Sequence, residues 1–286
     1  MKIIAHISDP HFGRDIPEVA QGLLDELNGI TAPMPSLIAI SGDLTQRARR
    51  AQYREARAWL DRLTAPYLVV PGNHDIPLYD LFHRFLAPMR RFKKYISADL
   101  TPFYEDDEMV VCGLNTAHGF TIKDGTIPPE QLATVCERFA LHPKRWKLLV
   151  AHHPFVIPRQ VPESYLVDGA SEAIPRLVNV RVDLILTGHL HVSYAHAPDA
   201  AGYRNEDHSV LGVNAGTCVS NRHRGEPNSY NRLEINGDTI SIVNRQWNGT
   251  KFVDGPEKAY RHGRGADRLV KVAEVTAPAV PPTTPA

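Results

Sequence analysis

Short apolar runs rich in Ile, Val and Leu alternate with longer polar segments along much of the chain. The runs lie at residues 3–7, 37–40, 67–70, 109–114, 148–151 and 182–186. Each run has the length of a β-strand and is apolar on both faces, which is typical of a strand buried inside an α/β protein. The pattern therefore predicts a set of buried strands rather than half-exposed ones.

The segments between these strands have helical periodicity. Within residues 46–63, an apolar face is formed at the spacing of an amphipathic helix by Tyr53, Ala56, Trp59, Leu60 and Leu63. Further helices are predicted at 18–27, 78–94 and 128–140, and the last of these begins with prolines, which favour the first turn of a helix. This alternation predicts βα units and a layered α/β architecture.

After about residue 205 the pattern changes to strands without helices between them. The segments HSVLGVNAGT, SYNRLEIN and DTISIVNRQWN are predicted strands, and NGD at 236–238 predicts a tight hairpin turn. From Thr276 onwards the chain is rich in Pro, Thr and Ala and is predicted to be disordered. We expect one domain over residues 1–260, followed by a C-terminal tail over residues 261–286.

The composition excludes some classes of protein. Lys+Arg and Asp+Glu each number 32 in 286 residues, so the chain lacks the overall positive charge on which nucleic-acid binding depends. The three cysteines form no CxxC motif and are predicted to be small buried apolar residues of a reduced compartment. No segment approaches the ~20 apolar residues of a membrane span, and the first residues are typical of a strand rather than a signal peptide. We therefore expect a cytoplasmic protein.

Five of the predicted strands are followed directly by side chains that bind metals. The motifs are SDPHFG with Asp9 and His11, GD with Asp43, GNHD with Asn73 and His74, HHP with His152 and His153, and GHLH with His189 and His191. Alone, each has an ordinary explanation, such as a helix cap at Asp43 or a turn at GNHD. In open α/β sheets, however, ligands bind beyond the carboxyl ends of the strands. Together, the five motifs predict a metal site at one rim of the fold, beyond the carboxyl ends of the strands.

The ligand types restrict the metal. Carboxylate, imidazole and amide donors without a thiolate favour Mn, Fe or Zn. About seven candidate ligands exceed the needs of one tetrahedral site, so we expect two metal ions ~3.5–4 Å apart with a carboxylate between them. A buried carboxylate at Asp43 is tolerable in that bridging position, because two cations offset the cost of burying its charge.

The set of motifs from Asp9 to His191 resembles the calcineurin-like metallophosphoesterases. Its flanking residues, SDPHFG, GDLT, VVPGNHD, HHP and GHLH, are most similar to the bacterial cyclic-nucleotide and glycerophosphodiester phosphodiesterases. The resemblance implies a four-layer α/β/β/α sandwich with mixed sheets flanked by helices. It also implies in-line attack on phosphorus by a metal-bound hydroxide.

The same resemblance implies a role for each matching residue. The first metal would be held by Asp9, His11 and His191, the second by Asn73, His152 and His189, and Asp43 would bridge the two. His74 would lie near the leaving group as proton donor or electrostatic stabiliser. In the adjacent histidine pair, His152 fits the H-x-P pattern of the ligand, and His153 is expected behind the ligands or at the surface.

One departure from a related pattern concerns the orientation of His74. Protein serine/threonine phosphatases of this superfamily have a second Asp shortly after the GD motif, and it orients the active-site histidine. The stretch GDLTQR has no such Asp, which argues against a protein phosphatase. Asp75 is a neighbour of His74, but a turn or helix cap explains it better.

Arginines at two places are candidates for phosphate binding. Arg222 and Arg224 follow a predicted strand, and arginine suits bidentate phosphate contact, although solvated loop arginines are common. Arg47, Arg49 and Arg50 are predicted to form a solvated face at the start of a helix.

The sequence thus favours a dinuclear metal-dependent phosphodiesterase acting on a small or nucleotide-like substrate. A phosphomonoesterase or pyrophosphohydrolase could use the same centre, and a non-catalytic scaffold is less expected because no ligand is missing. Zero net charge and the lack of a basic, aromatic-rich groove disfavour a nucleic-acid substrate. A homo-oligomer is left open.

Overall fold

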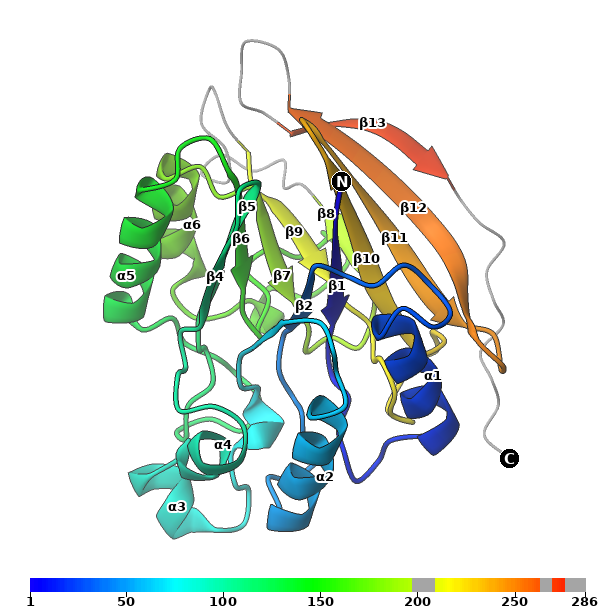
Figure 1. Ribbon diagram of the computed structural model, residues 1–286. Coiled ribbons are helices and arrows are strands. Elements are labelled where there is room, and N and C mark those ends of the chain that lie inside the picture. The colour runs from blue at the N-terminus through cyan, green and yellow to red at the C-terminus, as the bar shows by residue number, and fades with distance from the viewer. Residues whose placement is uncertain (197–208, 263–268, 276–286) are drawn as a thin grey trace.

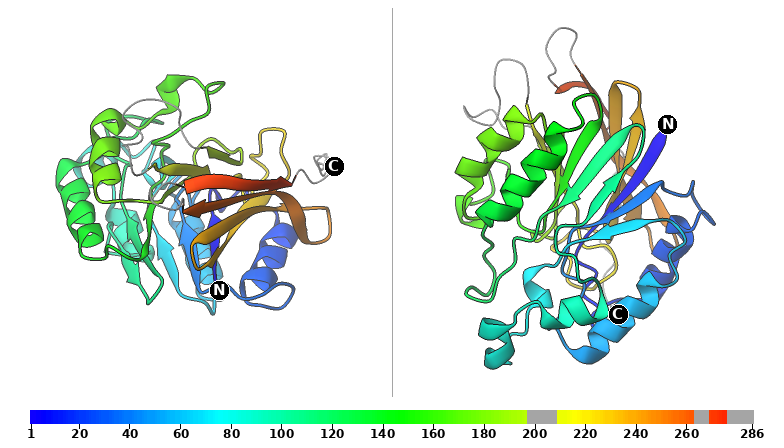
Figure 2. Two further views of the ribbon diagram at one scale, coloured as in Figure 1. Left: turned by 90° about the horizontal axis from the view of Figure 1, so that it is seen from above. Right: turned by 60° about the vertical axis from the view of Figure 1, so that its left-hand side comes forward.

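Two β-sheets lie face to face between two layers of helices in the computed structural model (Figure 1). The structure describes residues 1–196, 209–262 and 269–275. Viewed from above, the helices α5 and α6 lie on one side of the paired sheets and α1 on the other (Figure 2). Three separate apolar cores fill the spaces between successive layers. This arrangement confirms the predicted four-layer sandwich.

The first sheet is mixed. Its strand order is β13-β12-β11-β10-β1-β2-β3. β1 (Lys2–Ile7), β2 (Leu37–Ile40) and β3 (Tyr67–Val69) run parallel, whereas β10 (Ser229–Asn236), β11 (Thr239–Trp247), β12 (Phe252–His262) and β13 (Leu269–Val275) pair antiparallel. The β10–β11 hairpin turns at Gly237 with φ 61°, as the NGD sequence predicts.

The second sheet has a parallel centre with antiparallel edges. Its order is β4-β5-β6-β7-β9-β8. The parallel strands are β5 (Met109–Gly113), β6 (Trp146–Val150), β7 (Leu184–Thr187) and β9 (Leu211–Asn214), and the edges are β4 (Phe103–Glu105) and β8 (Tyr194–His196). Because the central strands are buried on both faces, their near-continuous apolar sequences are explained.

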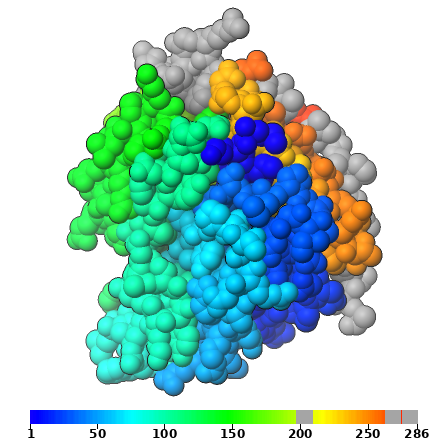
Figure 3. Space-filling view, viewed as in Figure 1, coloured from blue at the N-terminus to red at the C-terminus, as the bar shows by residue number. Residues whose placement is uncertain are grey.

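The helices cover the outer faces of the two sheets. α1 (Pro17–Leu27) and α2 (Arg50–Leu60) pack on the first sheet, and α5 (Pro129–Ala140) and α6 (Ala170–Asn179) pack on the second. The short helices α3 (Leu81–Leu86) and α4 (Arg90–Tyr95) form the lower left end of the molecule in the space-filling view (Figure 3). No helix in these described ranges has the length and apolar character needed to cross a bilayer.

Some helix predictions were wrong in their bounds. The helix expected over 46–63 begins only at Arg50, since the preceding residues turn around the candidate site. The helix expected over 78–94 is broken into α3 and α4 at Pro88, because a proline disfavours helical backbone in the residue before it. α6 was not predicted, since Pro175 lies inside it.

The C-terminal part differs from expectation in another way. β12 and β13 were not predicted, and β13 lies within the segment 261–286 that was expected to be a tail. The disorder predicted from residue 276 concerns positions outside the described residues. Two cysteines are buried as predicted, whereas Cys136 is only partly buried.

Candidate metal centre

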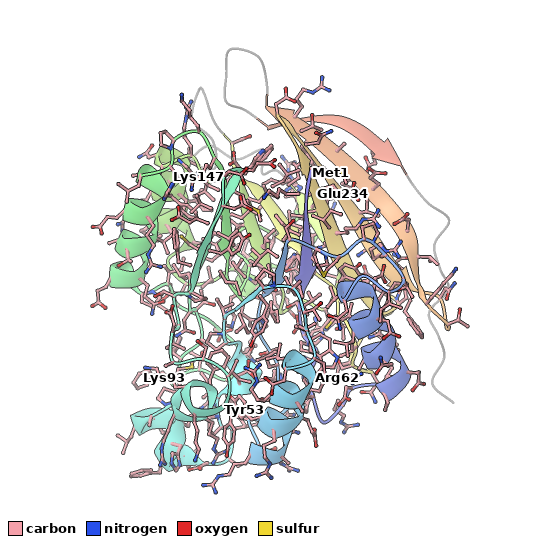
Figure 4. The ribbon with its side chains drawn as sticks, viewed as in Figure 1. Met1, Tyr53, Arg62, Lys93, Lys147 and Glu234 are labelled. Atoms are coloured by element: carbon pink, nitrogen blue, oxygen red, sulfur yellow. The ribbon has the colours of Figure 1, made fainter. Side chains whose placement is uncertain are left out.

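The ligand-type side chains meet where the parallel strands of both sheets end. They follow β1, β2, β3, β6 and β7, at the same end of the sandwich as α2 and α3 (Figure 1). Tyr53, labelled in Figure 4, marks this end, because its hydroxyl donates to the backbone carbonyl of Asp75 over 2.5 Å. Lys147 lies at the opposite end of the second sheet. The structure thus brings all seven predicted ligands to one rim.

One group of donor atoms comes from Asp9, His11 and His191. Asp9 Oδ1 lies 3.4 Å from His11 Nε2 and 3.6 Å from His191 Nε2. Both Asp9 Oδ1 and His11 Nε2 are buried and have no hydrogen-bond partner among the described residues. Donor atoms about 2.1 Å from one metal ion are about 3.0–3.4 Å apart, and unpaired buried polar atoms are costly. The group therefore fits a cation.

A second group comes from Asn73, His152 and His189. Asn73 Oδ1 lies 3.1 Å from both His152 Nε2 and His189 Nδ1. Asn73 Nδ2 donates to the Ile122 carbonyl over 3.1 Å, which turns its oxygen toward the histidines. His152 Nδ1 donates to the Ser41 carbonyl over 2.7 Å, so a ring that gives up its other proton to a metal ion presents a lone pair at Nε2. Two acceptors facing each other fit a shared cation.

Asp43 lies between the two groups. Its Oδ2 is 3.7 Å from His11 Nε2 and 3.4 Å from His152 Nε2, and its Oδ1 accepts the backbone N–H of His74 over 2.8 Å. Burial opposes ionisation, but the neighbouring histidines hold the pKa of Asp43 well below its usual range. Burial lowers the pKa of His152, but the Asp43 carboxylate outweighs this effect and raises that pKa to about 9. The Asp43 carboxylate thus stays ionised and favours a positive charge on the side of His152.

Backbone strain accompanies the donor set. Five of the seven predicted ligands have a positive φ: Asp9 (52°), His11 (45°), Asp43 (54°), His189 (70°) and His191 (60°). Such conformations are uncommon for residues other than glycine and persist where the surrounding structure imposes them. Gly72 allows the close approach at this rim, since a Cβ there would meet Asp43 Oδ1 at 2.1 Å.

His74 is held by groups that the sequence did not reveal. Its Nδ1 lies 2.8 Å from the backbone carbonyl of Gln46, and its Nε2 lies 3.0 Å from Arg222 Nη1. The Gln46 carbonyl thus occupies the orienting role for which no second Asp is present. Arg47 Nη1 donates to the same Gln46 carbonyl over 2.9 Å and lies beside His74, so the prediction that Arg47 belongs to a solvated face was wrong. Burial lowers the pKa of His74 although Asp43 opposes this.

The two arginines predicted for substrate differ in placement. Arg222 is partly buried and lines a cavity of about 250 Å³ beside Asn73 and His74, together with Arg47 and Arg84. Arg224 is exposed and is not among the residues that line this cavity.

Two neighbouring residues support the ligands. The buried Asp75 accepts hydrogen bonds from the backbone of the Asp43 loop and from Gly72, a role wider than that of a turn. His153 is fully buried behind His152 and His189, with Nδ1 2.7 Å from Thr116 Oγ1 and Nε2 3.0 Å from the Lys123 carbonyl. Because both ring nitrogens have these hydrogen-bond partners, His153 supports the ligands from behind.

The fold and these buried His/Asp clusters define a layered α/β protein with a centre consistent with two metal ions. Residues 3–193 match the family model described as calcineurin-like phosphoesterase, and the chain belongs to this family.

The chain is also similar to individual proteins, at low sequence identity or over only part of its length. Over 82 residues, 26% of this chain and 29% of the other, it is 34% identical to glycerophosphodiester phosphodiesterase GpdQ of Enterobacter lignolyticus. It is 27% identical over 216 residues, 67% of this chain and 62% of the other, to a cAMP/cGMP dual specificity phosphodiesterase of Mycobacterium tuberculosis. Purple acid phosphatase PPD1 from yellow lupin (Lupinus luteus) has a similar fold, with a TM-score of 0.64, 11% identity, and coverage of 90% of this chain and 53% of the other. The matched part spans less than two thirds of each of these three proteins.

Proposed function

We propose that this phosphoesterase is a dinuclear metal-dependent phosphodiesterase that hydrolyses a small or nucleotide-like phosphodiester. The observation that supports this most is the position of Asp43, whose Oδ2 faces the donor atoms of both groups. A carboxylate between two metal ions is the arrangement of two-metal hydrolytic sites. The two relatives whose names state a phosphodiesterase activity favour a diester.

In this proposal the seven ligand residues form two groups, the same two groups that their mutual contacts define. Asp9, His11 and His191 would hold one ion, Asn73, His152 and His189 would hold the other, and Asp43 would be shared between them. The donor set of imidazole, carboxylate and amide suits Mn, Fe or Zn. When bound, such ions activate water at neutral pH and neutralise charge on the phosphoryl oxygens.

His74 and Arg222 act together beside this centre. With Nδ1–H donating to the Gln46 carbonyl, neutral His74 accepts the Arg222 N–H at Nε2. The ring thereby fixes the guanidinium next to the cavity, where it can donate to oxygens of an anionic phosphate. Because Nδ1–H is held by the Gln46 carbonyl and Nε2 accepts from Arg222, we assign His74 electrostatic positioning rather than proton donation.

A phosphomonoesterase or pyrophosphohydrolase is the second candidate. The three arginines at the cavity, Arg47, Arg84 and Arg222, suit the higher negative charge of such substrates. The test compares initial rates on bis(p-nitrophenyl) phosphate and p-nitrophenyl phosphate, using chelated protein reconstituted with Mn²⁺. A preference for the diester supports the proposal, a preference for the monoester supports the second candidate, and no turnover of either with two ions bound supports a scaffold.

A further inference from the structure

Arg84 is a buried arginine in the wall of the cavity beside the metal centre. It lies on α3, only 5% of its surface is exposed, and it lines the same cavity as Arg222 and His74. Its Nη1 donates to the Pro77 carbonyl over 3.2 Å, and its Nη2 donates to the Thr121 carbonyl. These partners are neutral, so they leave its positive charge without compensation.

Among the described residues, no carboxylate compensates this charge. Arg84 forms no ion pair there, burial alone shifts its pKa, downward, and none of the residues that line the cavity is Asp or Glu. Arg47 and Arg222 add two more positive charges to the same wall. Burying a cation without a counter-charge is costly, so the cavity is built to receive negative charge.

A simple phosphodiester carries too little negative charge to match all three arginines. Its single negative charge is matched at the metal centre and by Arg222, which lies 3.0 Å from His74. Arg84 belongs to another part of the lining, with Ile76, Leu78 and Ile122. A cavity of about 250 Å³ is many times larger than the ~10–15 Å³ that a single water molecule needs, so a substituent of the phosphodiester has room there.

We propose that Arg84 forms a subsite for a second acidic group of the substrate, a carboxylate or a phosphate carried by the phosphodiester. The inference rests on the proposed function and narrows its substrate class to phosphodiesters with at least two negative charges. Guanidinium recognises both kinds of acidic group through paired N–H donors. The apolar side chains of Ile76, Leu78 and Ile122 would contact the carbon framework between the two acidic groups.

A purely structural role for Arg84 predicts a different outcome. Arg84 binds the Thr121 carbonyl and Asn73 binds the next carbonyl, that of Ile122, so Arg84 also helps to hold the loop that contacts Asn73. Loss of that support would lower activity on every diester alike. Loss of a subsite would lower activity on substrates with the second acidic group more than on those without it.

The experiment therefore measures a ratio of kcat/KM values within two matched pairs of substrates. Glycerophosphoserine differs from glycerophosphoethanolamine by one carboxylate, and a thymidine dinucleotide with a 5′-phosphate differs from the unphosphorylated form by one phosphate. Wild type, Arg84→Gln, Arg84→Lys and the control Arg54→Gln, an exposed arginine on α2, are compared with Mn²⁺ bound. Bis(p-nitrophenyl) phosphate reports the basic diesterase activity.

We expect wild type to prefer the acidic member of at least one pair by about tenfold, as a charged hydrogen bond allows. Arg84→Gln should reduce that preference about tenfold, Arg84→Lys should keep part of it, and Arg54→Gln should leave it unchanged. The pair that shows the effect identifies the acidic group. Equal rates within both pairs for wild type, or a preference that Arg84→Gln leaves intact, would overturn the subsite. If bis(p-nitrophenyl) phosphate is also not hydrolysed, the proposed function fails instead.

A second substitution covers the case in which Arg84→Gln does not fold. Ile122 lines the same cavity, and its side chain is 65% exposed, so a polar residue is tolerated there. Ile122→Asp should abolish the preference for the acidic substrate through repulsion, whereas Ile122→Asn should retain it. An unchanged preference in Ile122→Asp would contradict the proposed position of the subsite.

Discussion

The carboxylate of Asp75 joins the two loops that present Asp43 and Asn73. Its Oδ2 accepts the backbone N–H of Leu44 over 3.1 Å and that of Gly72 over 3.0 Å. Its Oδ1 accepts the backbone N–H and the hydroxyl of Thr45 over 2.8 and 3.0 Å. The substitution Asp75→Asn keeps the shape of this side chain but replaces one acceptor oxygen with an NH₂ group.

The loss of unfolding free energy caused by Asp75→Asn follows from the hydrogen-bond donors that lose their acceptor. Two of the four donors would face an NH₂ group, and each unsatisfied buried donor costs about 1–3 kcal/mol, or about 2–6 kcal/mol together. Against this, burial and then the Asp43 charge raise the pKa of Asp75 to about 6, so the ionised carboxylate at pH 8 carries a penalty of about 3 kcal/mol. The net cost in metal-free protein is therefore about −1 to 3 kcal/mol.

Metal ions change this balance. They would neutralise Asp43 and remove its part of the penalty on Asp75, while the larger part, from burial, remains. The cost of Asp75→Asn should therefore be larger in Mn²⁺-loaded protein than in metal-free protein. Urea unfolding at pH 8, with and without saturating Mn²⁺, measures both values, and Asp61→Asn, on an exposed ion pair, is the control. We also expect Mn²⁺ affinity to fall 10–100-fold, as for other residues that orient ligands. Equal unfolding free energies and equal Mn²⁺ affinity in variant and wild type would refute this reasoning.

Three further predictions concern the ligand bridge, His74 and a buried acid. Asp43→Asn should reduce bound metal from two ions to at most one per chain by elemental analysis, and two ions retained would exclude the bridging role. His74→Ala should keep both ions but lower kcat on a diester about 100-fold; an unchanged kcat would remove His74 from the mechanism. Burial raises the pKa of Asp183 to about 7, so its stabilising contribution is present below pH ~4 and is lost as pH rises through about 7. Asp183→Asn should flatten the fall of the melting temperature between pH 5 and 8, and an unchanged slope would contradict the assignment.

Much of the candidate site could be predicted because its signals are local. Each ligand motif directly follows a run of apolar residues, and the end of a buried strand fixes where the next side chains lie. The bounds of α2 and the break between α3 and α4 were less accessible, because turns around the site and a single proline override helical periodicity.

The supporting residues could not be predicted, because their roles depend on partners distant in sequence. Asp75 contacts backbone groups about thirty residues away, and the GNHD motif explains it equally well as a turn residue. Arg47 turns inward to His74 although neighbouring Arg49 and Arg50 are exposed as predicted. Nothing in the local sequence of α3 distinguishes Arg84 from the exposed basic residues of α4.

The most direct test of the central claim is a titration of Mn²⁺ into chelated protein while the rate of bis(p-nitrophenyl) phosphate hydrolysis is followed. The account predicts no turnover without metal and a rate that rises to a plateau at two equivalents per chain, because both donor groups share Asp43. Turnover by the metal-free protein, or a plateau at one equivalent, would contradict a dinuclear phosphodiesterase.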